Sequence, residues 1–239
     1  MKEVLKNLFK KLGYRIVNLN SIERDPFKDQ VRLISNNPTA IFDVGACTGE
    51  VSIHYNNLFS NSIIYCFEPY LPSFHILKEK TSSRKNIKCF NLALSNTSGE
   101  QNFHVNKFYA TNSILATHAD SAKNWNEEAL FTLEEIKISS ITLDDFVILH
   151  EIDKIDILKL DTQGTEFQII EGASQSIREN KISLIYMEII LMPTYQEQKN
   201  LDEILLLLRN MGFSLYNFYN YSYTNAGELR QVDAIFTRK

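Results

Sequence analysis

The segment FDVGACTG, from Phe42 to Gly49, decides the fold of this 239-residue chain. The apolar run over 40–44 predicts a short buried strand, and apolar residues at helical spacing over 51–59 predict a helix just beyond the turn. Gly45 and Gly49 let the backbone approach a ligand closely at the carboxyl end of the strand, where open α/β sheets bind their ligands. The segment therefore predicts a strand, a ligand-binding turn and a helix.

Strands and helices alternate along most of the remaining chain, which indicates a parallel sheet covered by helices on both faces. The segments 213–219 and 232–237 are joined through Gly227 and predict an antiparallel hairpin at the edge of this sheet. After the first unit, we expect strands over 62–67, 87–92, 155–160 and 182–189, and helices over 73–80, 142–149, 167–178 and 201–211.

The middle of the chain is less regular. Residues 100–105 alternate between apolar and polar and predict an extra strand. Residues 108–133 show weak periodicity and predict a long loop with one short helix. A loop of this length inside a domain usually has a functional reason, such as service as a lid.

Composition limits the classes of partner. Hydrophobic residues make up 44% of the chain and charged residues 23%, so a packed core is expected. The formal net charge of −4 does not favour broad nucleic-acid binding, and no apolar run is long enough to span a membrane. The cysteines Cys47, Cys66 and Cys89 form no Cys-x-x-Cys pattern, which favours reduced, buried thiols in the cytoplasm.

The N-terminal segment differs from the rest. Residues 1–12 place lysines among apolar residues at helical spacing and lack the pattern of a signal peptide. We expect an amphipathic helix docked on the domain, with a membrane-surface helix or pairing with a second copy in a homodimer as alternatives. Asp25-Pro26 predicts the start of a short helix over 27–35, so residues 1–38 form a helical appendage and 39–239 the main domain.

The turn after the first strand is unsuited to a dinucleotide. The dinucleotide fingerprint Gly-x-Gly-x-x-Gly requires a second glycine where Cys47 stands. Asp43 would repel a pyrophosphate, whereas its carboxylate can hold an ammonium group. S-Adenosylmethionine carries an ammonium and no phosphate, so the turn favours this cofactor, although a plain tight turn explains these residues about equally well.

Two acidic residues follow later strands of the sheet. Glu68 ends the second strand and can accept hydrogen bonds from both ribose hydroxyls of a nucleoside. The alternative is a solvated glutamate in a turn before Pro69. Asp161 ends the fourth parallel strand beside the expected cleft, and Gly164 allows a tight turn there. Asp161 can also cap the following helix.

Several separated motifs, in their order and spacing, resemble the FkbM-type S-adenosylmethionine-dependent methyltransferases over about residues 39–239. They are Phe42 to Ala46 with Gly49, Phe67-Glu68-Pro69, Ala93-Leu94-Ser95, Thr142-Leu143-Asp144, Leu158 to Asp161 with Gly164 and Glu166, Glu188, Gly212-Phe213, and Gln231-Val232-Asp233. The chain departs from the family at Cys47, where Asn or Asp is common, and at Gln163, where Glu is common.

The resemblance implies a Rossmann-like class I methyltransferase fold, a mostly parallel seven-stranded sheet with an antiparallel last strand. It also implies O-methylation of hydroxyl groups, often on sugars of surface polysaccharides, glycolipids or natural products. Apart from the resemblance, the positions of Gln163, Tyr195 and Asp233 make them candidates for substrate contacts, with a simple loop at Tyr195 and solvation of Asp233 at a strand end as the alternatives. The implied cofactor-binding residues are Asp43, Gly45, Ala46, Thr48, Gly49, Glu68, Pro69, Ala93, Leu94, Ser95 and Asp161.

Methyl transfer to a sugar hydroxyl calls for a general base or a divalent cation, because the hydroxyl is a poor nucleophile. Asp161 and Glu188 both fall at carboxyl ends of strands. Together they could bind Mg²⁺, or one could act as base and the other as orienter without metal. His104 and His118 are weaker candidates for the base.

Two other hypotheses are compatible with the sequence. An NAD- or nucleotide-dependent enzyme can use the same sheet, and a non-catalytic module can keep the fold. The acceptor can be a glycan or a small molecule, with a sugar hydroxyl, another hydroxyl or an amine as the methylated group.

Overall fold

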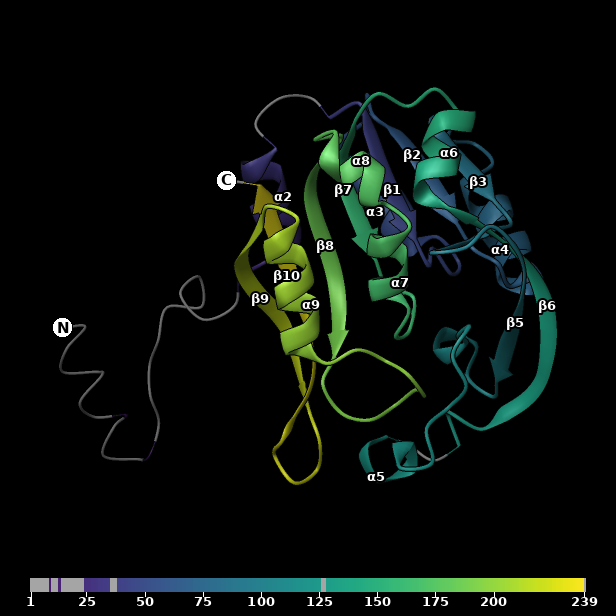
Figure 1. The fold of residues 1–239 in the computed structure, drawn as a ribbon, viewed down its shortest axis with the longest axis vertical. Coiled ribbons are helices and arrows are strands. Elements are labelled where there is room, and N and C mark those ends of the chain that lie inside the picture. Colours follow the sequence, from purple (N-terminus) through teal and green to yellow (C-terminus); the bar gives the residue numbers. More distant parts are fainter. Residues whose placement is uncertain (1–8, 10–12, 14–23, 35–37, 126–127, 239) are drawn as a thin grey trace. The chain divides into compact units, whose positions relative to one another are not determined.

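A seven-stranded sheet forms the centre of the chain (Figure 1). The computed structural model describes residues 9, 13, 24–34, 38–125 and 128–238. The strand order is β3-β2-β1-β7-β8-β10-β9, and β10 runs antiparallel to both of its neighbours. This confirms the predicted mostly parallel sheet with an antiparallel hairpin at its edge. The strands are β1 (Ala40–Val44), β2 (Ile63–Phe67), β3 (Ile87–Phe90), β7 (Ile155–Leu160), β8 (Ile182–Ile190), β9 (Phe213–Tyr223) and β10 (Leu229–Arg238).

The central strands β1 and β7 are mainly apolar and are buried along their whole length, as expected for strands covered on both faces. Val44 of β1 is in register with Phe67 of β2 and with Leu160 of β7. The residue after each of these strands therefore emerges at one edge of the sheet. That shared carboxyl edge brings Gly45, Glu68 and Asp161 together, although they are far apart in sequence.

Helices cover both faces of the sheet. In Figure 1, α6 (Leu143–Leu149), α7 (Glu166–Glu171), α8 (Ser174–Arg178) and α9 (Leu201–Asn210) lie in front of it, and α3 (Glu50–Leu58) and α4 (Leu71–Thr81) lie behind. Phe146 of α6 packs its ring edge-on against Phe42, Phe67 and Phe90, with centroid separations of 5.7, 4.7 and 5.0 Å. Such aromatic contacts add to the burial that fixes the helix on the sheet.

The predicted single helix over 167–178 is wrong, because the chain forms α7 and α8 in its place. At Gly172, between them, a Cβ atom would lie 2.1 Å from the carbonyl oxygen of Ser95. Asp144 then accepts hydrogen bonds from the backbone N–H groups of Gln175 and Ser176, at 2.8 and 2.7 Å, and so caps α8. Thr142 caps α6 as predicted, accepting from the N–H of Asp145 at 3.0 Å.

A second sheet of three strands was only partly predicted. It comprises β4 (Ala93–Ser95), β5 (Gly99–Asn106) and β6 (Thr132–Thr142), in the order β4-β6-β5. The expected extra strand over 100–105 is β5, but β6 was missed. The polar face of β6 is exposed and only Ile138 and Ser140 are fully buried, so its apolar periodicity is weak. Between β5 and β6 lie a 3-10 turn, Tyr109–Thr111, and α5 (Ser121–Asn124).

The chain divides into two compact units, Met1–Leu33 and Ile34–Lys239. In the first unit, Asp25 accepts from the N–H of Phe27 at 2.9 Å at the start of α2 (Pro26–Leu33), which confirms the predicted helix start. Apart from Phe9, the amphipathic helix expected over 1–12 falls outside the described residues.

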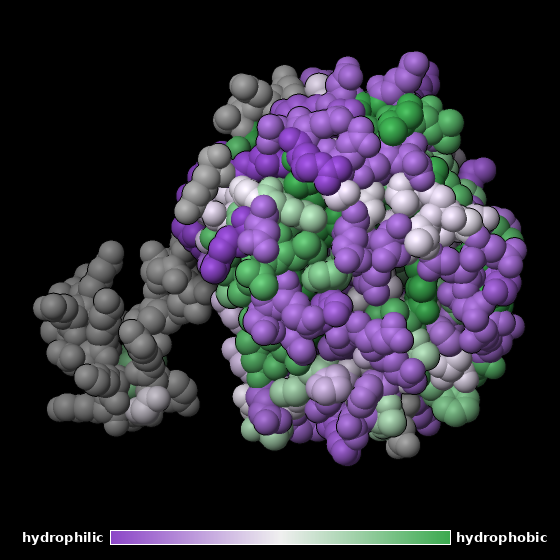
Figure 2. Space-filling view, in the orientation of Figure 1, coloured by the Kyte–Doolittle hydropathy of each residue, from purple (hydrophilic) through white to green (hydrophobic). Residues whose placement is uncertain are grey.

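The surface seen in Figure 2 is mainly polar, with smaller apolar areas between the charged side chains. Among the described helices, none is long and apolar enough to cross a lipid bilayer. The three cysteines are free thiols. Cys66 is buried as predicted, whereas Cys89 and Cys47 are partly exposed, and Cys47 lies in the turn after β1.

Candidate active site

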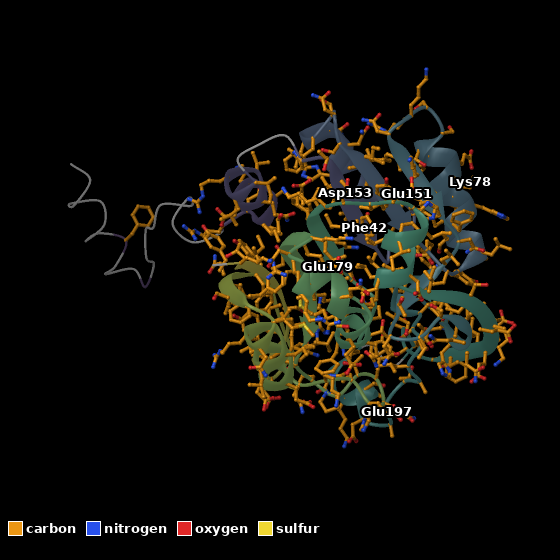
Figure 3. All side chains as sticks on the ribbon, turned by 45° about the horizontal axis from the view of Figure 1, so that its top comes forward. Phe42, Lys78, Glu151, Asp153, Glu179 and Glu197 are labelled. Carbon is orange, nitrogen blue, oxygen red and sulfur yellow. The ribbon has the colours of Figure 1, made fainter. Side chains whose placement is uncertain are left out.

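A cavity of about 220 Å³ opens at the carboxyl edge of β1, β2 and β7. Gly45, Glu68 and Asp161 line one side of it. The other side comes from β5 and the segment that follows it, which contribute Phe103, Tyr109, Ala110, Asn112 and Ile114. The loop predicted over 108–133 thus supplies a wall of the ligand cavity. Figure 3 labels Glu151, Asp153 and Glu179, which precede β7 and β8 and therefore mark the opposite, amino edge of the sheet.

The turn after β1 brings the backbone to the cavity. Gly45 has a φ of 73°, and a Cβ on it would lie 1.9 Å from the carbonyl oxygen of Asp161, so only glycine fits. Gly49, with a φ of 92°, packs instead against Leu77 of α4. In this turn Gly45 and Cys47 line the cavity, whereas the expected cofactor residues Ala46, Thr48 and Gly49 are not among its lining residues. Their expected role is therefore indirect, through the shape of the turn.

Glu68 is held rigidly at the end of β2. Its Oε2 accepts from the N–H of Cys47 at 2.9 Å, and its Oε1 accepts from the N–H of Tyr70 at 2.8 Å. The side chain of Asn91 donates to the carbonyls of Glu68 and Pro69, which fixes the turn. Burial raises the pKa of Glu68 to about 7, against the opposing effect of the two N–H donors. The alternative of a solvated glutamate is therefore wrong.

Asp43 lies behind the cavity and is fully buried. Its Oδ1 is 2.9 Å from Nζ of Lys159, and its Oδ2 accepts from the hydroxyl of Ser52 at 2.5 Å. The ammonium group expected on Asp43 is thus that of Lys159, a residue of β7. The expectation that Asp43 binds the cofactor directly is corrected, because its carboxylate is already engaged and does not line the cavity.

Lys159 connects this buried carboxylate to the cavity edge. Its Nζ donates to the carbonyl of Gly45 at 3.0 Å and lies 3.7 Å from Oδ2 of Asp161. Burial alone would lower the pKa of Lys159, but Asp43 and Asp161 hold it above its ordinary value, so the side chain stays charged. Sequence reasoning missed this role, although a lysine in a strand buried on both faces was the available signal.

Asp161 and Glu188 are joined by one amide group. Nε2 of Gln163 donates to Oδ1 of Asp161 at 3.2 Å and to Oε2 of Glu188 at 2.9 Å. Gln231 of β10 donates to the other oxygen of Glu188 at 2.7 Å. Gln163 adopts a left-handed φ of 58°, an uncommon conformation for a residue with a side chain. Asp161, Gln163 and Glu188 all line the cavity, as predicted.

Several carboxylates surround Glu188. Burial, and then the negative charges of Asp161 and Glu166, raise the pKa of Glu188 well above its ordinary value. Glu166 is also buried and accepts from the N–H groups of Thr162 and Gly164. Glu166 therefore holds the turn after β7, and Asp161 makes no capping bond to α7.

Tyr195 positions Gln163 from behind. Its hydroxyl lies 2.9 Å from Oε1 of Gln163 and 2.9 Å from the carbonyl oxygen of Thr111. Because Oε1 faces this hydroxyl, Nε2 must face the two carboxylates. Tyr195 is 1% exposed and does not line the cavity, so the expected direct contact with substrate is corrected to a positioning contact.

The remaining expected site residues divide between the cavity and its surroundings. Pro69, Ala93 and Leu94 line the cavity, whereas Ser95 does not. Asp233 lies opposite Glu188 on β10 but is engaged by the hydroxyl of Tyr186 and the amide of Asn220, both at 2.6 Å. Neither His104, beside Glu135, nor the more exposed His118 is among the lining residues.

The donor set does not fit the Mg²⁺ site considered for Asp161 and Glu188. The amide nitrogen of Gln163 already bridges the two carboxylates, in the position a cation would need. Within the described part of the chain, no group of three or more His, Cys, Asp and Glu side chains is arranged to hold a metal ion.

Comparison with known proteins places this arrangement in a family. The family described as Methyltransferase FkbM domain matches residues 43–215, which run from the end of β1 to the start of β9. The chain belongs to the FkbM methyltransferase family. A curated relative, the 2-O-methyltransferase NoeI of Sinorhizobium fredii (strain NBRC 101917 / NGR234), is 25% identical over 182 residues, or 74% of each protein.

Solved structures of methyltransferases are among those to which this FkbM family member is similar. Magnesium protoporphyrin IX methyltransferase (ChlM) from Synechocystis PCC 6803 with bound SAM is 13% identical, with a TM-score of 0.48 over 89% of this chain and 77% of that one. TrmK from M. capricolum, in complex with S-adenosyl-homocysteine, is 12% identical, with a TM-score of 0.48 over 88% and 68%. The strand order and the antiparallel β10 give the class I methyltransferase fold predicted from the sequence.

Proposed function

We propose that the protein is an S-adenosylmethionine-dependent O-methyltransferase that methylates a hydroxyl group of a sugar. The observation that carries the proposal is that one cavity joins Glu68 to the pair of Asp161 and Glu188. A carboxylate suited to ribose hydroxyls and a carboxylate suited to proton transfer thus face the same cavity. The 2-O-methyltransferase name of the relative supports an oxygen acceptor.

The described lining residues fit S-adenosylmethionine better than a dinucleotide. Glu68 offers carboxylate oxygens to a ribose diol, and the apolar side chains of Phe67, Leu92 and Leu94 border a region suited to a flat base. No Lys, Arg or His is among the described residues that line the cavity. A pyrophosphate would find no cation there, which argues against NAD.

The cofactor supplies a methyl group on a positively charged sulfur, which leaves as a neutral thioether. The protein must then position the acceptor hydroxyl and take its proton. We assign to Glu188 the role of the base that accepts the proton of the acceptor hydroxyl, because a carboxylate with a raised pKa is the stronger base. The amides of Gln163 and Gln231 hold that carboxylate still, and Asp161 orients the reacting groups beside it.

The test is transfer of a labelled methyl group from S-adenosylmethionine to a panel of neutral methyl glycosides, combined with calorimetry of cofactor binding. We expect binding of S-adenosylmethionine, no binding of NAD, and labelled methyl ethers on at least one sugar. Binding of NAD without S-adenosylmethionine would contradict the proposal, and so would cofactor binding with label transferred only to amines.

Glu68 gives cofactor binding a pH dependence. The carboxylate accepts ribose hydroxyls when it is deprotonated, and its pKa is about 7, so affinity falls as the pH drops through that value. Between pH 8 and pH 6 we expect the dissociation constant for S-adenosylmethionine to rise roughly tenfold. Calorimetry at both values measures this change. The Glu68→Gln variant should bind more weakly at pH 8 and lose the pH dependence, and an unchanged slope in that variant would refute the assignment.

The proposal extends to the domain organisation, the class of acceptor and the cellular compartment. We infer that residues 39–239 form the catalytic domain and that 1–38 are an appendage. We place the acceptor in the assembly of a surface polysaccharide, glycolipid or natural product, and the reaction in the cytoplasm. Three free cysteines without a disulfide partner support a reducing compartment.

A further inference from the structure

Two cysteines occupy adjacent positions on β2 and β3. Cys66 of β2 is in register with Cys89 of β3, the edge strand of the sheet beside α4 (Figure 1). Residues paired in this way point to the same face, on strands that are about 4.7–4.9 Å apart. This spacing lies within the range of about 4.4–6.8 Å between the Cα atoms of disulfide-bonded cysteines. The backbone therefore places the two thiols where a disulfide can form.

The two thiols also interact with each other. A hydrogen bond between them is the largest influence on the pKa of each thiol. It raises the pKa of Cys66 well above its ordinary value and lowers the pKa of Cys89 to about 6. Thr81 and Lys78 of α4 act on the pKa of Cys89 in the same direction, against the opposing effect of burial. At neutral pH Cys89 is therefore largely a thiolate, the reactive form of cysteine, beside a Cys66 that keeps its proton.

Access to solvent differs among the three cysteines. Cys66 is fully buried, whereas Cys89 is partly exposed at the edge of the sheet. An oxidant needs to reach only Cys89, because the buried thiol lies next to it. Cys47 is also partly exposed, but burial raises its pKa to about 11, so this thiol stays protonated and reacts slowly. Cys89 is thus the thiol that combines access with the reactive form.

The cysteine pair is connected to the turn after β1 and to Glu68 through hydrogen bonds. The N–H of Glu68, two residues after Cys66, donates to the carbonyl of Phe90 on β3 at 3.1 Å. The thiol of Cys66 donates to the hydroxyl of Ser52 at 3.0 Å, and Ser52 in turn donates to Asp43. A disulfide removes this thiol hydrogen. It also draws β2 and β3 together just before Glu68, because the bond is only about 2.05 Å long.

We propose that Cys66 and Cys89 are a redox-sensitive pair that a peroxide converts to a disulfide, and that this bond weakens the binding of S-adenosylmethionine. The formation of the bond is independent of the proposed function, whereas its effect on the cofactor rests on that function. A reversible pair of this kind suits a reducing compartment, in which disulfides are usually transient and often sense oxidants.

The reaction consumes one molecule of hydrogen peroxide in two steps. The Cys89 thiolate attacks one peroxide oxygen, the O–O bond breaks, and the products are a sulfenic acid on Cys89 and hydroxide. The Cys66 sulfur then attacks the sulfur of the sulfenic acid, the S–O bond breaks, and the leaving hydroxide takes the proton of the Cys66 thiol to form water. The two sulfurs lose two electrons in total, and the peroxide gains them. A dithiol reductant restores both thiols by thiol–disulfide exchange.

Mass spectrometry of the peroxide-treated protein tests the bond. We expect the intact chain to lose the mass of two hydrogen atoms and to regain it with dithiothreitol. Trypsin leaves Cys47 and Cys66 on one peptide, because no Lys or Arg lies between Arg32 and Lys78, and it places Cys89 on another. In Cys47→Ser these two peptides should still be joined after oxidation, which assigns the bond to Cys66. In Cys66→Ala and in Cys89→Ser the peptides should stay separate.

Calorimetry in the Cys47→Ser background tests the effect on the cofactor, because that background contains no thiol in the cavity. Oxidation should raise the Kd for S-adenosylmethionine by about threefold to tenfold, the effect of losing roughly one hydrogen bond, and reduction should reverse the change. Cys89→Ser in the same background should bind the cofactor equally well before and after peroxide.

Separate peptides after peroxide treatment overturn the inference, whether or not Cys89 has gained oxygen. Joined peptides with an unchanged Kd also overturn it and leave the proposed function standing. A reduced protein that does not bind S-adenosylmethionine contradicts the proposed function, and with it the effect on the cofactor, whereas joined peptides in that protein support the disulfide independently.

Discussion

Replacing Glu188 with Gln should lower kcat by about two to four orders of magnitude, the usual contribution of a general base. Glutamine has nearly the same shape but cannot take the proton of the acceptor hydroxyl. The affinity for S-adenosylmethionine should stay within about threefold, because Glu68 and the turn after β1 remain intact. Labelled methyl transfer under saturating substrates measures kcat, and calorimetry measures cofactor affinity.

The control for this change is Glu179→Gln, at the amino edge labelled in Figure 3, which should behave as the wild type. The pH profile supplies a second check. Glu188 acts as a base only when deprotonated, so kcat/KM should fall as the pH drops through its raised pKa, above the range of an ordinary glutamate. A kcat for Glu188→Gln within tenfold of the wild-type value would remove Glu188 from the role of base.

Replacing Lys159 with Met should destabilise the fold by about 3–5 kcal/mol, because it leaves the Asp43 carboxylate buried without its partner. Asp43 would retain one hydrogen bond, from Ser52. Chemical denaturation of the two proteins at neutral pH measures the difference in unfolding free energy. Lys199→Met is the matched control, since Lys199 pairs with Glu203 at the surface, where loss of a pair costs about 1 kcal/mol or less.

The double variant Asp43→Asn with Lys159→Met separates a buried-charge effect from a packing effect. If the single change is costly because a charge is stranded, removing that charge should recover a large part of the lost stability. A double variant as unstable as the sum of its single variants would show that Lys159 acts through packing alone. A loss below about 1 kcal/mol in Lys159→Met would contradict the ion pair itself.

The sheet could be predicted because its signals are local. The inner parallel strands β1 and β7 are short, mainly apolar runs buried along their whole length, and a helix follows each of them. Apolar periodicity did not predict β6, because the polar face of this strand is exposed. It also failed at Gly172, where a close approach to Ser95, distant in sequence, divides the predicted helix in two.

The candidate site was predicted in part for a related reason. Glu68 and Asp161 could be predicted because they directly follow β2 and β7, and Glu188 because it lies near the carboxyl end of β8; the register of the sheet places these positions at one edge. The residues that contact these carboxylates could not be predicted from strand position. Tyr195 positions Gln163, and Lys159 pairs with Asp43. Both contacts depend on packing between segments that are distant in sequence.

The contact between Gln231 and Glu188 has a consequence for biosynthesis. The turn after β1, at Gly45, is synthesised early, whereas the amide that holds the proposed base belongs to β10, which lies between β8 and β9 in the sheet. A nascent chain arrested on the ribosome before residue 229 would already carry Glu68, Asp161 and Glu188 yet lack this strand. Methyl transfer should therefore begin only after β10 has left the exit tunnel, so that an incomplete chain does not consume the methyl donor.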